Sequence, residues 1–86
     1  MEQHLRHLLD ELSAAIGRSK HREEREELAQ LHERVERRLA RAEGENEDHG
    51  GLVDALEKAE IQFEREHPTL AESLRGAIQA LSAAGI

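Results

Sequence analysis

Hydrophobic residues recur at intervals of three and four in four stretches of the chain, the spacing that aligns side chains on one face of a helix. This pattern predicts helices over about 2–16, 20–43, 51–66 and 69–84. No stretch alternates as a strand would, so we expect an all-α fold. The residues expected to face inward are Leu5, Leu8, Leu9, Leu12 and Ile16, then Leu28, Leu31, Val35, Leu39 and Ala42, then Leu52, Val53, Leu56, Ala59 and Phe63, and finally Leu70, Leu74, Ala77, Ile78 and Leu81.

Glycine, serine and proline mark where these helices should begin and end. Gly17 stands where a left-handed residue often closes a helix, and Ser19 is suited to cap the next helix. Residues 44–51 contain three glycines and no periodicity, so we expect a flexible acidic loop there.

The break before the last helix has its own signals. A helix usually ends before the residue that precedes proline, which applies to His67 and Pro68, and the His67 side chain could cap the following helix. Thr69 and Glu72 have the spacing of a capping box. At the other end, Gly85 in a left-handed conformation would turn Ile86 back toward Leu81. The residues expected to have structural roles are His67, Pro68, Thr69, Glu72, Gly85 and Ile86.

The short connections favour two antiparallel helical hairpins, packed as a bundle or coiled coil, within a single domain over 1–86. The chain has 86 residues, no cysteine and one aromatic residue, Phe63. A core this small and this poor in aromatics adds little stability. We therefore expect oligomerisation to complete the fold.

Acidic residues dominate the chain, and their distribution restricts the partners it could bind. The net charge is −7, and residues 44–66 contain 8 acidic and 2 basic groups. A phosphate backbone would be repelled from that region, whereas a basic protein would be attracted. No apolar run is long enough for a membrane span, and the N-terminus does not resemble a signal peptide. We expect a cytoplasmic protein.

Two segments resemble one bacterial family. The opening Met1-Glu2-Gln3-His4-Leu5-Arg6-His7-Leu8-Leu9 is similar to its N-terminal helix. The closing Phe63-Glu64-Arg65-Glu66-His67-Pro68-Thr69-Leu70, continuing to Gly85-Ile86, is similar to its most recognisable segment. The family is domain of unknown function 4404, a set of small helical bacterial proteins. The middle of the chain matches only in helical character. The resemblance implies a bacterial, cytosolic, helical protein and no catalytic residue.

Six histidines raise the question of a metal site. His4, His7 and Glu11 have a spacing that can align ligands on a helix. On a helical wheel, however, His7 points away from the leucine stripe and His4 lies at its flank, so we predict no metal and no other cofactor. His32 is expected to lie at the edge of its helix beside Glu36.

Catalysis is not predicted. Carboxylate pairs such as Glu23 and Glu27 are common here, but acid–base chemistry needs a cleft that perturbs their pKa values. No nucleophile stands in a recognised motif, and no glycine-rich loop follows a strand.

Arginines cluster near the end of the second predicted helix, within about a third of its circumference. These residues could contact nucleic acid, but the net charge and the lack of stacking aromatics oppose this. Basic residues at a helix C-terminus also complement its dipole. The alternative is a solvated face or a contact with another subunit. The residues are Arg34, Arg37, Arg38 and Arg41.

Ile61 is the apolar residue that departs from the pattern, because it lies opposite the inward face of the third helix. Asp54, Glu57 and Glu64 surround it. We predict that this face meets another chain and that the arginines of the second helix receive it.

These observations support a non-catalytic helical interaction protein that self-associates. One alternative is an acidic regulatory or adaptor module that binds a basic protein through the third helix. A weaker alternative is a histidine-based metal-binding domain.

Overall fold

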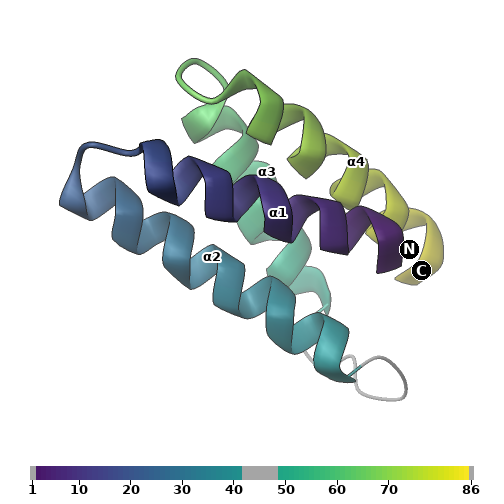
Figure 1. Ribbon diagram of the computed structural model, residues 1–86. Coiled ribbons are helices and arrows are strands. Elements are labelled where there is room, and N and C mark those ends of the chain that lie inside the picture. Colours follow the sequence, from purple (N-terminus) through teal and green to yellow (C-terminus); the bar gives the residue numbers. More distant parts are fainter. Residues whose placement is uncertain (1, 42–48, 86) are drawn as a thin grey trace.

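The computed structural model describes residues 2–41 and 49–85 and contains four α-helices in these residues (Figure 1). They are α1 (Glu2–Arg18), α2 (Arg22–Arg41), α3 (His49–Phe63) and α4 (Pro68–Gly85). No strand occurs in the described part of the chain, so the prediction of an all-α fold with four helices is confirmed. Most of the expected loop over 44–51 lies outside the described residues, and its last three residues belong to α3.

Helix packing produces a bundle with principal extents of 38 × 20 × 19 Å. Helix α1 packs against both α2 and α4, and α3 packs against α4, whereas α2 and α3 meet only sparsely. In Figure 1, α1 and α2 run in opposite directions, as do α3 and α4. None of the four helices combines the length and apolar character needed to cross a membrane.

The core follows the predicted stripes, because residues three and four apart lie on the same helix face. Several expected core residues are only partly buried and pack against its edge, namely Leu9, Ile16, Leu39, Val53 and Ile78. The buried apolar side chains are Leu5, Leu8, Leu12 and Ala15 of α1, Leu28, Leu31 and Val35 of α2, Leu52, Leu56, Ala59 and Phe63 of α3, and Leu70, Ala71, Leu74, Ala77 and Leu81 of α4.

The boundary between α1 and α2 differs from the prediction. Helix α1 continues through Gly17 to Arg18, and Gly17 keeps a helical rather than a left-handed backbone. Ser19 does not cap α2, which begins later. The Arg25 amide donates to the His21 carbonyl at 3.0 Å, so His21 is the N-cap residue. The Ser19 hydroxyl instead donates to the His21 carbonyl at 3.3 Å.

The α3–α4 boundary also differs. Helix α3 begins at His49 rather than 51 and ends at Phe63 rather than 66. Residues 64–66 form a turn, because Pro68 lacks the amide that would bond to the fourth residue before it.

Pro68 is the first residue of α4, a position that tolerates proline. The Ala71 amide donates to the His67 carbonyl at 3.0 Å, so His67 rather than Thr69 is the N-cap. The expected capping box of Thr69 and Glu72 is therefore not formed, because Thr69 lies inside α4 rather than at its N-cap position. At the other end, Gly85 is the last residue of α4. Ile86 lies outside the described residues, so its contact with Leu81 stays a prediction.

Candidate functional site

A buried hydrogen bond joins the start of α2 to the α3–α4 connection. The His67 side chain is 6% exposed, and its Nε2 lies 2.5 Å from Oε2 of Glu24. An ionised carboxylate can only accept, so Nε2 carries the ring proton and donates it. The same ring meets Phe63 edge-on, with centroids 6.0 Å apart. The expectation that this side chain caps α4 is thus wrong, since its Nε2 bonds to Glu24 instead.

Glu66 completes a group of possible metal ligands with His67 and Glu24. One ligand atom from each lies within 4.8 Å of the others, and imidazole with carboxylates is a donor set that zinc accepts. A metal on Nε2 would move the ring proton to Nδ1. That atom is buried without a hydrogen-bond partner among the described residues, whereas metal-bound histidines usually donate their second N–H to an acceptor. The geometry therefore suits a structural hydrogen bond better than a metal.

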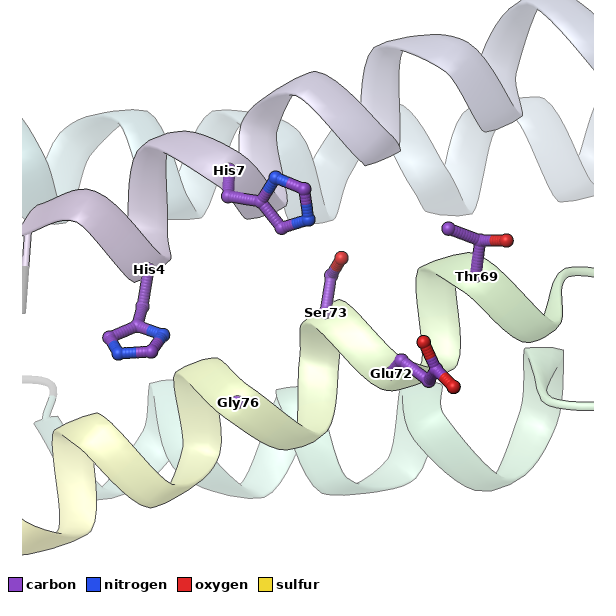
Figure 2. A pocket seen from close by; sticks show the side chains of 6 residues that line it. All are labelled: His4, His7, Thr69, Glu72, Ser73 and Gly76. Carbon is purple, nitrogen blue, oxygen red and sulfur yellow. The ribbon is translucent and has the colours of Figure 1, made fainter.

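His4 and His7 lie along a shallow groove between α1 and α4. Its volume is about 220 Å³. Figure 2 shows His7 and Ser73 projecting into the space between the two helices, with His4 further along α1, opposite Gly76. Nδ1 of His4 lies 3.5 Å from the point that a Cβ would occupy if Gly76 carried a side chain. The groove is lined by His4, His7, Thr69, Glu72, Ser73 and Gly76.

The groove does not gather metal ligands. Among the described residues, three histidine or carboxylate groups come within ligand distance only at the Glu24 cluster. Glu11, which has the spacing of a ligand beside His4 and His7, is half-buried on α1 and does not line the groove.

Ser13, His32 and Glu36 form a chain of polar contacts between α1 and α2. The Ser13 Oγ lies 3.3 Å from His32 Nε2, and His32 Nδ1 lies 3.6 Å from Oε1 of Glu36. His32 is half-buried beside Glu36, as predicted. The order of groups is that of a serine hydrolase triad. However, Ser13 is in the middle of α1, where backbone amides are bonded within the helix, so its own amide cannot stabilise an oxyanion.

Comparison with known proteins identifies the family. The family described as Domain of unknown function (DUF4404) matches residues 2–86. The chain belongs to this family. The match includes the middle of the chain, where the sequence showed only helical character. No curated protein and no solved structure matches the chain.

In this DUF4404 member, the arginines of α2 do not form one free basic stripe. Arg37 lies 3.8 Å from Glu33 of the same helix. Arg34 and Arg38 are half-buried, and Arg34 also interacts within the chain. The side chain of Arg41, the last residue of α2, falls outside the described part.

Helical position explains the burial of Arg34 and Arg38. They follow Glu27 by seven and eleven residues, and residues at these spacings share a helix flank. Glu27 accepts a hydrogen bond from Gln62 of α3 at 2.5 Å, so this flank of α2 faces α3. These two arginines, predicted to receive the Ile61 face of another chain, therefore lie on the flank of α2 that packs toward α3.

The outer face of α3 matches the prediction at its centre but not in its charge. Ile61 is 76% exposed, and Asp54, Glu57 and Glu64 are exposed around it. Two exposed basic residues, Lys58 and Arg65, lie on the same face, three residues before Ile61 and four after it. Sequence reasoning named only the acidic neighbours, although helical spacing alone would have identified the basic ones.

Proposed function

We propose that this protein is a non-catalytic, cytoplasmic interaction protein that associates with further copies of itself through α3. The supporting observation is Ile61, which is the one large apolar side chain exposed among the described residues, at 76%. Burying the Ile61 side chains of two copies against each other would remove this apolar surface from water. A single exposed isoleucine is common on protein surfaces, so the proposal also depends on the charges around it.

The charges favour a like partner over a basic one. Lys58 and Arg65 interrupt the acidic surface formed by Asp54, Glu57 and Glu64. A strongly basic protein would meet like charges at these two positions. A second copy presents both signs and can pair with both. This mixture therefore favours self-association over the alternative of an acidic adaptor for a basic partner.

The size of the patch implies weak association. Burying an isoleucine side chain contributes about 1.5–3 kcal/mol, so two copies contribute about 3–6 kcal/mol before the entropy lost on association. Association itself costs at least about 4 kcal/mol, so the two isoleucines alone leave little net affinity and the surrounding charged pairs must add to it. The dissociation constant should therefore be no tighter than on the order of 10⁻⁴ M, which corresponds to about 5.5 kcal/mol. We expect a reversible oligomer at this concentration rather than a permanent one.

Sedimentation equilibrium tests the proposal. Samples from about 20 μM to 1 mM should show an average mass that rises with concentration, because this range brackets the expected dissociation constant. The mass of one chain at every concentration would refute self-association. Glu11→Gln is a suitable control, because the half-buried carboxylate that it changes lies on α1 rather than on α3. Its average mass should rise with concentration as that of the parent does.

A further inference from the structure

Two hydrogen bonds determine which way Ile61 points. The neighbouring Glu60 accepts from Nε of Arg75 on α4 at 2.8 Å, and Gln62 on the other side donates to Glu27 of α2 at 2.5 Å. Glu60 and Gln62 therefore face opposite neighbours. Ile61 lies between them and points outward, away from both α2 and α4.

Charged residues form two rows beside Ile61, one of each sign. At 100° per residue, Glu57 and Glu64 lie about 50° toward the α4 side, and Lys58 and Arg65 lie about 50° toward the α2 side. Glu64 and Arg65 lie beyond the end of α3, in the turn that the hydrogen bond from the His67 amide to the Phe63 carbonyl closes at 2.8 Å. This bond has the spacing of one helical turn, so we place the two residues by the same rule.

The four charged side chains are available to a partner. All are exposed. Among the described residues, none of Glu57, Lys58, Glu64 and Arg65 forms an ion pair or a side-chain hydrogen bond. No ion pair in 2–41 or 49–85 therefore occupies these charges on either side of Ile61.

We propose that two copies of the chain pack α3 against α3 in parallel, about a two-fold axis that runs along the helices, with Ile61 at the centre. This inference rests on the proposed self-association and specifies its geometry. A parallel two-fold axis places the acidic row of each copy against the basic row of the other. Glu57 then faces Lys58 of the partner subunit, and Glu64 faces Arg65 of the partner subunit.

The opposite orientation is disfavoured by charge. A two-fold axis perpendicular to the helices keeps each row on its own side of the interface. The acidic row would then face the acidic row, with Glu57 near Glu64 of the partner subunit. Like charges in direct opposition are destabilising, and electrostatic complementarity selects orientation more than it adds affinity.

Asp54 limits the length of the contact. It lies two turns before Ile61 and about 20° from the same line along the helix, so in a parallel pair it would approach its own copy. The two helices must therefore cross at Ile61 and diverge toward Asp54. Packed helices commonly cross at about 20° or more, which provides this separation.

Charge exchange within one chain tests the orientation. Lys58→Glu should raise the dissociation constant at least about fivefold at low salt, because two ion pairs per dimer become repulsive. The double variant Glu57→Lys with Lys58→Glu should return it to within about twofold of the parent, since the pair is restored with its signs exchanged. Ile61→Lys should weaken association by more than about tenfold.

Arg22→Glu is the matched control, because it alters the net charge as Lys58→Glu does but lies at the exposed start of α2. Circular dichroism should show unchanged helicity in every variant. If the parent associates but Lys58→Glu or Ile61→Lys has no effect, or the double variant is not restored, this interface is refuted while self-association stands. Tighter association of Lys58→Glu would indicate the antiparallel pair and also refute it. A monomeric parent would refute both proposals.

Discussion

Replacing Glu24 with alanine should destabilise the fold by about 1–3 kcal/mol, because it leaves a buried donor without an acceptor. His67 is 6% exposed and donates its Nε2 proton to Glu24. A change of tautomer cannot relieve the loss, since Nδ1 is buried and has no partner among the described residues. Both neutral forms of the ring would therefore keep an unpaired N–H.

Glu23→Ala is the matched control for this measurement. Glu23 and Glu24 both lie in the first turn of α2, where a carboxylate stabilises the helix by about 0.3–1 kcal/mol through its interaction with the helix dipole. Glu23 is exposed, so the difference between the two variants isolates the hydrogen bond. Urea unfolding at neutral pH, followed by circular dichroism, should give the lower midpoint for Glu24→Ala. Equal free energies of unfolding, within about 0.5 kcal/mol, would show that His67 does not depend on this carboxylate.

Gly17→Ala should stabilise the chain by about 0.5–1 kcal/mol in urea unfolding, because Gly17 is helical and has open space where a Cβ would go; a loss of stability would instead indicate a left-handed residue. Leu56→Ala should lower the free energy of unfolding by about 2–5 kcal/mol, since Leu56 is fully buried. Leu9→Ala, at a half-buried position, should lower it clearly less in the same assay, and equal losses would contradict the assigned core. Equimolar zinc should leave the melting temperature of the chelator-treated protein unchanged, because a metal on His67 would bury an unpaired N–H; a rise of several degrees that Glu66→Gln abolishes would establish the metal site.

Helix number and the buried faces could be predicted because they depend on local periodicity. Leu5, Leu8 and Leu12 align on one face in any α-helix, and a face of leucines is buried in whatever bundle forms. Pro68 likewise marks a helix start by its own covalent structure. The same reasoning identified Ile61 as exposed, since it lies opposite the buried face of its helix.

Helix ends were predicted less well, because several residues compete for each end. Gly17 permits a left-handed backbone but does not require one, and α1 continues through it to a last turn in which the Ser19 amide donates to the Ile16 carbonyl at 3.3 Å. Ser19 and Thr69 are good caps in isolation. The chain instead places His21 and His67 at the N-cap positions, where their carbonyls accept the first bonds of α2 and α4, and side-chain preferences do not reveal this choice.

Contacts between distant segments were decided by the tertiary structure alone. Glu24 and His67 are 43 residues apart, and Ser13 and His32 are 19 apart, so no local spacing relates either pair. Periodicity identifies the buried stripe of a helix but not which polar flank faces which neighbour, because both flanks are polar in every arrangement. Arg34 and Arg38 are half-buried rather than free because the packing of the bundle turns their flank toward α3.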